Sequence, residues 1–355
     1  MNALATAGSA PHPGPLPASQ GEGARGIVLV NVGTPDSPSV SDVRRYLAEF
    51  LNDPRVIDIH PAARWLLLNL VILPFRPRKS AHAYQQIWTP QGSPLLVNSN
   101  AQLAALRAAM PGVEVELAMS YGKPSMPEAL EKLRARGVTQ ITLVPMFPQY
   151  ASATTGGVVE AWHRLLGLQV QPPATAVLPA FHAKPGFIAA FAENIRTTVA
   201  TSNADHVLFS FHGLPIRQLA PVCKDAPRGR PCGPLGPGHE HCYRAQCLAT
   251  SDALAKAAGL TTFTTAFQSR LKGATWLSPF TDEVVAELAR KGVKRLAVAC
   301  PSFVADCLET LEEIGLRAAD TFKEAGGESL TLVPSVNASP QFISMLAEEL
   351  RRSAP

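Results

Sequence analysis

The stretch Val207-Leu-Phe-Ser-Phe-His-Gly-Leu-Pro215 carries the pattern on which the fold prediction rests. Its first five residues are almost all apolar and predict a buried β-strand, which the glycine and the proline then end. His212 therefore stands where the strand stops. Ligands of parallel α/β sheets bind at the carboxyl ends of the strands, so a functional site is expected in segments of this kind.

Other short apolar runs have the same character and alternate with segments of helical periodicity. This alternation is typical of parallel sheets flanked by helices, and it fits two such sheets. The first set of predicted strands covers residues 26–32, 113–120 and 140–145, and the second set covers 174–178, 206–211, 261–267, 294–299 and 329–333. Predicted helices cover residues 41–51, 100–110, 126–136, 185–200, 242–258, 281–291, 304–325 and 340–351.

A chain of 355 residues exceeds the usual size of one compact domain, so two domains are expected. We assign residues 25–170 to the first domain and 171–338 to the second, which includes a Cys-rich insert at 223–247. The final segment, 339–355, is a predicted helix, and packing back on the first domain is one arrangement open to it. Residues 1–24 are rich in alanine, glycine and proline and are expected to form a disordered tail.

The composition argues against several classes of function. Apolar residues make up 46% of the chain and charged residues 17%, as in ordinary globular proteins. The net charge of +4, without a basic block interleaved with aromatic residues, argues against nucleic acid as a partner. No secretory signal is recognisable, so we expect a cytoplasmic protein whose cysteines bind metal, act in catalysis or stay free.

Two side chains are the first candidates for chemistry. The imidazole of His212 can take a proton near neutral pH or bind a metal, although a histidine that only caps the strand end fits the local pattern equally well. Glu309 lies in the predicted helix 304–325, where Asp306, Glu309 and Glu313 are spaced to share one face. Such a row of oxygen ligands suits the passage of a divalent cation, but the local pattern alone favours an ordinary solvent-facing helix start.

A cysteine-rich insert is the most unusual local feature. Cys223, Cys232, Cys242 and Cys247 enclose a segment so dense in glycine and proline that it cannot form a helix or a central strand. Four thiolates are the ligand count of a 2Fe-2S cluster or of a structural zinc site. We favour the cluster, with zinc and with free or disulfide-bonded cysteines as alternatives. The remaining cysteines, Cys300 and Cys307, are expected to be buried free thiols.

Two further segments each have two interpretations. The loop Pro145-Met-Phe-Pro-Gln-Tyr-Ala-Ser-Ala-Thr-Thr-Gly156 could hold a flat ligand or its carboxylates, or it could be a plain turn with Thr154 or Thr155 as helix N-cap. The apolar run Trp65–Leu73 is too short to cross a bilayer. It is either a core helix or an exposed apolar lip that touches a membrane surface or a large apolar ligand.

Six motifs, in order, resemble the signatures of the ferrochelatase family. They are Val30-Asn-Val-Gly-Thr-Pro35, Gly92-Ser-Pro94, Phe147-Pro-Gln-Tyr-Ala-Ser-Ala-Thr-Thr-Gly156, Ser210-Phe-His-Gly-Leu-Pro215, Phe267-Gln-Ser-Arg270 and Phe303-Val-Ala-Asp-Cys-Leu-Glu-Thr310. The resemblance implies a chelatase fold of two Rossmann-like domains, each with a parallel four-stranded sheet flanked by helices, and a porphyrin in the cleft between them. It implies that ferrous iron and protoporphyrin IX are the substrates.

The resemblance also implies roles for individual residues. His212 matches the family's active-site histidine and is expected to accept a proton or deliver iron, whereas Glu309 and Asp306 are expected to relay protons or iron from the opposite face. The positions that match pocket-lining or substrate-binding residues are Ser93, Tyr121, Tyr150, Trp276 and Phe303. The run Trp65–Leu73 is similar to the lip of the family's pocket.

Two departures from animal-type members refine these expectations. The C-terminus has no cysteine and the loop of the third motif carries Ser152, which excludes the animal-type cluster, whereas some bacterial members resemble this chain in their internal cysteine-rich insert. Val32 stands where members that use coproporphyrin have a tyrosine, which favours protoporphyrin. Alternatives are a coproporphyrin enzyme, a cobalt or nickel chelatase of the same fold, and a non-catalytic haem or iron-sulfur sensor.

Overall fold

The computed structural model describes residues 24–353, except 224, 226–234, 237–238 and 272–273. The predicted tail at 1–24, apart from Ala24, lies outside the described residues. Cys232, one of the four cysteines of the insert, does so as well.

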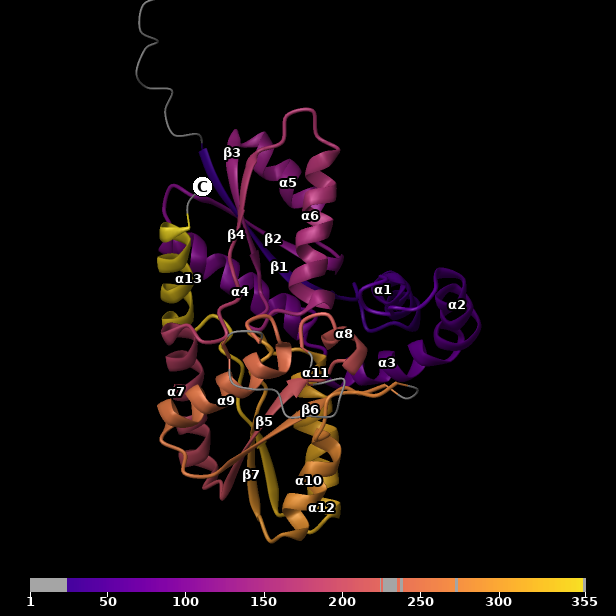
Figure 1. The fold of residues 1–355 in the computed structure, drawn as a ribbon, viewed down its shortest axis with the longest axis vertical. Helices are drawn as coiled ribbons and strands as arrows, with labels where there is room; N and C mark the ends of the chain where they lie inside the picture. The colour runs from indigo at the N-terminus through magenta and orange to yellow at the C-terminus, as the bar shows by residue number, and fades with distance from the viewer. Residues whose placement is uncertain (1–23, 224, 226–234, 237–238, 272–273, 354–355) are drawn as a thin grey trace, which may run out of the picture.

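Two parallel four-stranded sheets form the centre of the molecule, as predicted, and lie one above the other along its long axis (Figure 1). The upper sheet has the order β2-β1-β3-β4, and the lower sheet has the order β6-β5-β7-β8. The strands are β1 (Ala24–Thr34), β2 (Glu114–Gly122), β3 (Val138–Pro145), β4 (Ala174–Val177), β5 (His206–His212), β6 (Phe263–Gln268), β7 (Arg295–Ala299) and β8 (Ser329–Leu332).

The prediction that placed strand 174–178 in the second sheet was wrong. β4 pairs with β3 of the first sheet, from Gln140 opposite Ala174 to Leu143 opposite Val177. Parallel neighbours need a crossover connection, and helix α6 (Gly157–Gly167) supplies it between β3 and β4. Apolar periodicity identifies a strand but not the sheet that it joins. The chain therefore leaves the first sheet after β4.

Helices cover both sheets. They are α1 (Val40–Asn52), α2 (Pro61–Leu66), α3 (Leu73–Ile87), α4 (Pro94–Ala109), α5 (Met126–Ala135), α6, α7 (Pro185–Ser202), α8 (Ile216–Leu219), α9 (Tyr243–Ala258), α10 (Thr281–Arg290), α11 (Leu308–Leu311), α12 (Ala319–Glu324) and α13 (Pro340–Arg352). Described π-helical segments are η1 (Leu67–Ile72), between α2 and α3, η2 (Ser152–Gly156), which leads into α6, and η4 (Glu313–Ala318), between α11 and α12. In the described part of the chain, none of these helices is long and apolar enough to cross a membrane.

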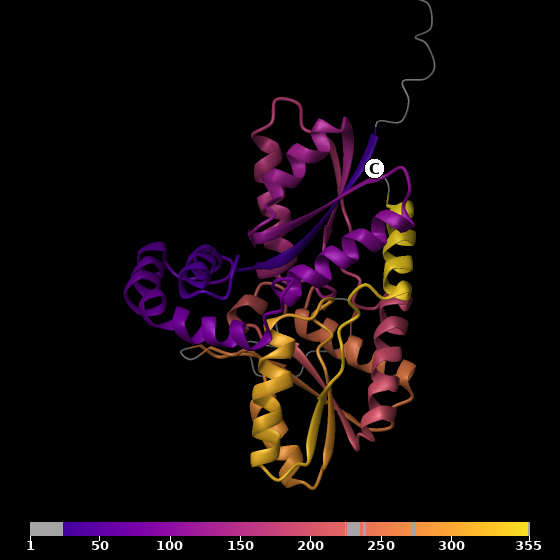
Figure 2. The same ribbon diagram turned by 180° about the vertical axis from the view of Figure 1, so that it is seen from behind.

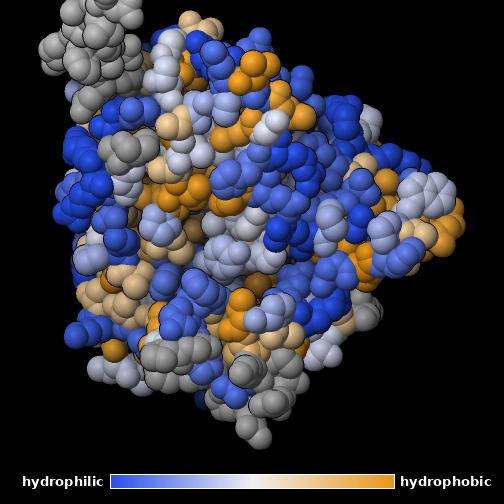
Figure 3. Space-filling model, turned by 45° about the horizontal axis from the view of Figure 1, so that its top comes forward, coloured by the Kyte–Doolittle hydropathy of each residue, from blue (hydrophilic) through white to orange (hydrophobic). Residues whose placement is uncertain are grey.

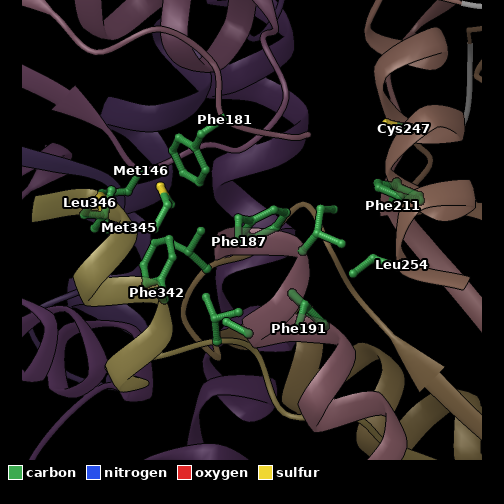
Figure 4. Close-up of a cluster of buried hydrophobic side chains, with 14 of the residues drawn as sticks. Met146, Phe181, Phe187, Phe191, Phe211, Cys247, Leu254, Phe342, Met345 and Leu346 are labelled. Atoms are coloured by element: carbon green, nitrogen blue, oxygen red, sulfur yellow. The ribbon is translucent and has the colours of Figure 1, made fainter. Parts of the chain in front are cut away.

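The largest core lies between the sheets and includes side chains of both, such as Leu29 of β1 and Phe209 of β5. Around Phe187 of α7, the rings of Phe181 and Phe342 approach to centroid distances of 5.6 and 6.3 Å (Figure 4). Burying each such ring contributes about 2 kcal/mol to stability. Because Phe342 belongs to α13, the C-terminal helix is part of this shared core.

Helix α13 also contacts the first half of the chain, where it lies against α4 (Figure 2). The Arg351 guanidinium donates a hydrogen bond to the Ala109 carbonyl at 2.8 Å. A second link between the halves is the buried amide of Gln102 on α4, which donates to the carbonyls of Val304 and Asn337, each at 3.0 Å. Val304 precedes the predicted acidic residues, so α4 fixes the position of that segment.

Candidate active site

His212 is the last residue of β5, and both of its main-chain polar groups are occupied. Its N–H donates to the hydroxyl of Ser302 at 2.9 Å, and its carbonyl accepts a hydrogen bond from the hydroxyl of Tyr243 at 2.8 Å. Ser302 lies in the segment that follows β7, the strand next to β5 in the sheet. Neighbouring parallel strands thus bring their carboxyl ends together at this residue.

Among the described residues, the imidazole of His212 is held through one of its two nitrogens. Nδ1 lies 2.7 Å from the Gly213 carbonyl, and because a carbonyl can only accept, Nδ1 carries the hydrogen. In the neutral ring Nε2 then carries the lone pair and is the nitrogen that can take a proton or a metal. The ring of Phe303 packs at 6.3 Å from the imidazole, centroid to centroid. A side chain at position 213 would meet the Gln268 carbonyl at 2.8 Å, so this position requires glycine.

Glu309 lies at the start of α11 and lines a small cavity together with Tyr46, Tyr84, Ser93 and Cys307. The thiol of Cys307 is hydrogen-bonded to the Glu309 carboxylate. Burial, and after it the charge of Glu309, raise the pKa of the Cys307 thiol well above its usual value. The thiol therefore stays protonated beside this carboxylate.

Gln268 connects the two candidate residues, and sequence reasoning did not assign it this role. Its carbonyl accepts the Gly213 N–H at 2.8 Å, and its side-chain amide donates to the Glu309 carbonyl at 2.8 Å. Its Oε1 accepts the hydroxyl of Ser210 at 2.6 Å. The available signal was its place in the motif Phe267-Gln-Ser-Arg270, at the end of a predicted strand.

The predicted row of three carboxylates on one helix face is not present. The helix expected at 304–325 begins only at Leu308, because Cys307 is extended (φ −147°, ψ −170°) and caps α11. The Asp306 carboxylate lies before the helix and accepts hydrogen bonds from the Ser335 N–H, the Thr310 hydroxyl and the Asn337 amide. Their lengths are 3.2, 3.2 and 2.8 Å.

The Glu313 carboxylate binds a different segment from Asp306 and Glu309. Its carboxylate accepts the N–H and the hydroxyl of Ser269 at 2.9 and 2.6 Å. Asp306 and Glu313 each fix a loop, and Glu309 is the member of the three that lines the cavity. The contacts thus distinguish Glu309 from its two acidic neighbours.

The residues predicted to bind substrate fall into two groups. Ser93 lines the Glu309 cavity, Phe303 packs on His212, and Trp276 pairs with Pro215 beside Gly213. The indole N–H of Trp276 is buried and has no hydrogen-bond partner among the described residues, as expected of a group that meets a ligand.

Tyr121 and Tyr150 are engaged by the protein itself. The Tyr121 hydroxyl donates to Asp53 at 2.8 Å, and burial, then this carboxylate, raise its pKa above the usual value. The N–H of Tyr150 donates to the side-chain carbonyl of Gln246 at 2.8 Å, and its ring packs edge-on to His241. Among the described residues, no hydrogen bond or ring contact joins either tyrosine to His212 or Glu309.

Three of the four insert cysteines can be placed. Cys223, Cys242 and Cys247 are buried, and no disulfide bond joins any two of the five described cysteines. Cys242 lies at the N-cap of α9 and is close enough to Cys247 to influence its ionisation. Among the described residues, no group of three or more His, Cys, Asp and Glu side chains is arranged to hold a metal ion. Cys232 lies outside that set, so the four-cysteine site stays a prediction.

A model of the ferrochelatase family matches residues 24–354. The chain belongs to the ferrochelatase family. Curated ferrochelatases similar to it include that of Coxiella burnetii (strain CbuG_Q212), 43% identical over 92% of this chain and 93% of the relative. Those of Legionella pneumophila (strain Corby) and Pseudomonas putida (strain F1) are each 44% identical over 91% of this chain and 97% of the relative.

Solved structures show the same chelatase fold. SirB from Bacillus subtilis with Fe3+ superimposes with a TM-score of 0.55 at 13% identity, covering 93% of this chain and 95% of SirB. SirB in complex with cobalt gives a TM-score of 0.53 at 12% identity, with the same coverage of both chains. At such low identity this likeness concerns the fold alone. The ferrochelatase resemblance that the six motifs predicted, and the fold it implied, are both confirmed.

Asp306→Ala tests whether this carboxylate is an anchor. The change leaves the Ser335 N–H, the Asn337 amide and the Thr310 hydroxyl without their acceptor, so we expect the free energy of unfolding to fall by about 1–3 kcal/mol. Urea denaturation measures it. The matched change Asp252→Ala, at an exposed position on α9, should shift it by less than about 0.5 kcal/mol. Equal stabilities of the two variants would contradict the anchoring role.

Proposed function

We propose that this chain inserts ferrous iron into a porphyrin and so forms haem. The observation that carries the proposal is His212 at the end of β5, whose Nε2 has no hydrogen-bond partner among the described residues, in a chain that belongs to the ferrochelatase family over residues 24–354. A free-base porphyrin bears two pyrrole protons that must leave before metal can enter. The reaction therefore needs proton acceptors beside the macrocycle.

His212 is the proposed acceptor of a pyrrole proton. When Nε2 takes the proton, the positive charge on the ring is stabilised by the Gly213 carbonyl, to which Nδ1–H already donates. The main-chain bonds to Ser302 and Tyr243 hold the residue in place while this happens. Little reorganisation is needed at the moment of transfer, which is the condition for efficient acid-base catalysis.

Glu309 is the proposed partner of His212. The Cys307 thiol lies beside its carboxylate, and the hydroxyls of Tyr46 and Tyr84, whose pKa values burial raises, remain protonated in the same cavity. A carboxylate in this setting can accept the second proton or hold the incoming ferrous ion. We give Asp306 an anchoring role, since three donors already occupy its oxygens.

Protoporphyrin IX is the proposed porphyrin. Val32, which replaces the tyrosine of coproporphyrin-using members, lines the same cavity as Glu309 and packs against the cluster of Leu95, Ala305 and Cys307. An apolar side chain there suits an apolar edge of the macrocycle and supplies no hydrogen bond to an additional carboxylate. Coproporphyrin is the alternative substrate.

We also propose that Cys223, Cys232, Cys242 and Cys247 hold a 2Fe-2S cluster. The three described members are buried, and burial raises the pKa of the Cys247 thiol well above its usual value. Ionising a thiol in such surroundings is costly unless a metal binds the sulfur. Cys242 sits at the N-terminus of α9, where the helix dipole favours a thiolate. Zinc is the alternative occupant.

A cluster could transfer single electrons, but iron insertion consumes none. The proposed role is therefore to clamp the segment between Cys223 and Cys242, whose sequence is dense in glycine and proline. Any effect of the cluster on iron insertion must therefore be a structural one, transmitted by the residues between the cluster and the active site.

A peripheral membrane contact is the third proposal. The segment from α2 to α3 projects from the side of the molecule, and its tip carries apolar side chains (Figures 1 and 3). Trp65, Leu70 and Phe75 are exposed to 58, 61 and 74%. This exposure supports an exposed lip at residues 65–73, with Leu68 as its buried member. The exposed Arg78 and Lys79 lie beside these side chains, which suits an anionic membrane surface on the cytoplasmic side.

His212→Ala should lower the rate of insertion by at least about 100-fold while porphyrin still binds, because the proton acceptor is lost and the pocket is not. The assay incubates protein anaerobically with ferrous, cobalt or nickel ion and with protoporphyrin or coproporphyrin, and follows metalloporphyrin absorbance. The exposed His163→Ala is the matched control.

Wild-type turnover in the His212 variant would refute its role. If the wild type forms no metalloporphyrin, the proposed enzymatic activity is refuted. A preference for cobalt or nickel over ferrous ion would instead identify the protein as a cobalt or nickel chelatase of the same fold.

The purified protein should be coloured and contain iron and acid-labile sulfide in equal amounts, and Cys232→Ser should bleach it because one of four ligands is lost. Cys300→Ala removes a buried thiol outside the insert and should leave the colour unchanged. Metal and sulfide analysis with visible absorbance provides the measurement. A colourless wild type with one zinc per chain would support the structural zinc site instead.

Replacing Trp65, Leu70 and Phe75 together by serine should weaken binding to anionic phospholipid vesicles by more than about tenfold, since each buried apolar side chain contributes over 1 kcal/mol. Co-sedimentation measures the binding. The matched control replaces Leu168 and Val170, which are 78 and 99% exposed on another part of the surface. If wild type and lip variant sediment alike while porphyrin affinity falls, the lip serves the porphyrin and not a membrane.

A further inference from the structure

A short loop, residues 53–58, lies at the base of the apolar lip. It follows α1 and leads to α2, where the lip begins. Asp53 accepts a hydrogen bond from the Tyr121 hydroxyl of β2 at 2.8 Å, which ties the loop to the first sheet. The Arg64 guanidinium of α2 donates to the Ile57 carbonyl at 3.2 Å, which ties the loop to the lip. The loop is therefore attached to the first half of the chain at both of its ends.

Arg55 strengthens this attachment in the middle of the loop. Its guanidinium donates to the Ser152 hydroxyl at 2.7 Å and forms an ion pair with the carboxylate of Glu160 on α6. Two charge-assisted bonds from one planar group fix the direction of the side chain as well as its position. On the side of the first half, the loop is thus held by several independent contacts.

The same loop reaches helix α8 of the second half. The Asp58 carboxylate accepts two hydrogen bonds from the Arg217 guanidinium, one of them from Nε at 2.7 Å. The Gln218 side-chain amide donates to the Arg55 carbonyl at 3.1 Å. Both donors belong to α8, which begins four residues after His212, and α8 lies beside the projecting segment from α1 to α3 (Figures 1 and 2). These contacts join the base of the lip to the segment that starts at the candidate active site.

The segment after His212 also has support within the second half. The Leu277 N–H donates to the Leu214 carbonyl at 3.0 Å, and the Ile216 N–H donates to the Thr275 carbonyl at 2.9 Å. These main-chain bonds hold the start of α8 without any help from the loop. Contact between the loop and α8 can therefore break while both partners keep their conformation.

The contact between the loop and α8 is weaker than the attachments on either side of it. The side chains of Asp58 and Arg217 are 30 and 45% exposed. An ion pair this exposed contributes little to stability, because water competes for both charges and salt screens them. The loop is thus held firmly by the first half of the chain and loosely by the second, as a part that opens and closes must be.

The lip and α8 lie next to different candidate residues. Side chains of the lip, Leu67 and Ile72, belong to one apolar cluster with Leu308, the residue before Glu309. Helix α8, by contrast, follows His212. Loop 53–58 therefore joins the side of the site at Glu309 to the side at His212.

We propose that loop 53–58 is a latch on the porphyrin site, which the Asp58–Arg217 pair holds closed and which opens when a porphyrin enters or a metalloporphyrin leaves. This proposal rests on the proposed function, which puts the macrocycle beside His212. In the closed arrangement the loop and α8 touch each other directly, so a rigid macrocycle cannot pass between them. Opening steps of this kind set the turnover of many enzymes.

Asp58→Asn keeps the shape of the side chain and removes its charge. We expect the rate constants for association and for dissociation of protoporphyrin to rise together, each about threefold, while Kd changes by less than about 1.5-fold. A latch alters the barrier in both directions, whereas a residue that binds the porphyrin alters Kd. Stopped-flow porphyrin fluorescence measures both rate constants in the absence of iron.

Salt and a charge reversal provide two further readouts. A higher ionic strength should raise both rate constants of the wild type more than those of Asp58→Asn, because salt screens the exposed pair. Asp58→Arg combined with Arg217→Asp forms the pair again in reverse. This double variant should return to the rate constants of the wild type, whereas either single reversal should exceed them.

Glu193→Gln is the matched control. Glu193 and Arg196 form an ion pair within α7, and their side chains are 53 and 47% exposed. Removing this charge leaves loop 53–58 and α8 unchanged, so both rate constants should equal those of the wild type.

Unchanged rate constants in Asp58→Asn would overturn the latch. Faster dissociation with unchanged association would make Asp58 a porphyrin-binding residue and would also reject the latch. If the double reversal leaves the rate constants as high as the single reversals do, the ion pair is not the closing contact and the proposal fails. A wild type that exchanges porphyrin but forms no metalloporphyrin would reject the proposed function separately, because the rate constants are measured without iron.

Discussion

The buried amide of Gln268 holds the two candidate catalytic residues in one arrangement. Its main chain bonds to Gly213 and its side chain bonds to the Glu309 carbonyl, and only 2% of the residue is exposed. Each bond contributes only about 1 kcal/mol net, but a buried partner left unpaired costs about 1–3 kcal/mol. The arrangement depends on the register that sets His212 opposite Gln268 in β5 and β6, because a shift of β6 by one residue would turn the Gln268 side chain to the other face.

The way in which His212 and Glu309 are fixed leaves their reactive atoms available. His212 is held by its N–H, its carbonyl and Nδ1, and Nε2 keeps its lone pair. Glu309 is fixed through its main-chain carbonyl, and its carboxylate meets the Cys307 thiol in the cavity. Asp306 is the opposite case, since its carboxylate itself anchors the loop at Ser335 and is not left for chemistry. The candidates for catalysis are thus anchored through main-chain groups, whereas the structural acids are anchored through their carboxylates.

The sequence predicted what local patterns determine. All eight strands were located, because buried parallel strands are short apolar runs ended by turn residues, and His212 was identified at a strand end. The strand at 174–178 was assigned to the wrong sheet. Its apolar sequence identifies it as a strand, but the partner strand with which it pairs is determined by the fold of the whole chain. The start of the helix at Leu308 was missed because Asn337, distant in sequence, fixes the residues before it. The roles of Gln268 and Tyr243 likewise depend on several distant partners, which no spacing rule connects.

The position of the cysteine insert in the chain leaves the sheet beside the candidate active site undisturbed. Parallel neighbours β5 and β6 need a crossover connection, and this connection begins at His212 and includes both the insert and α9. Lengthening a surface connection costs little free energy, so the insert leaves the sheet register intact. Its last two cysteines nevertheless fall on the first turns of α9, beside Tyr243. The helix that follows the insert therefore holds the main chain of His212 through the Tyr243 hydroxyl.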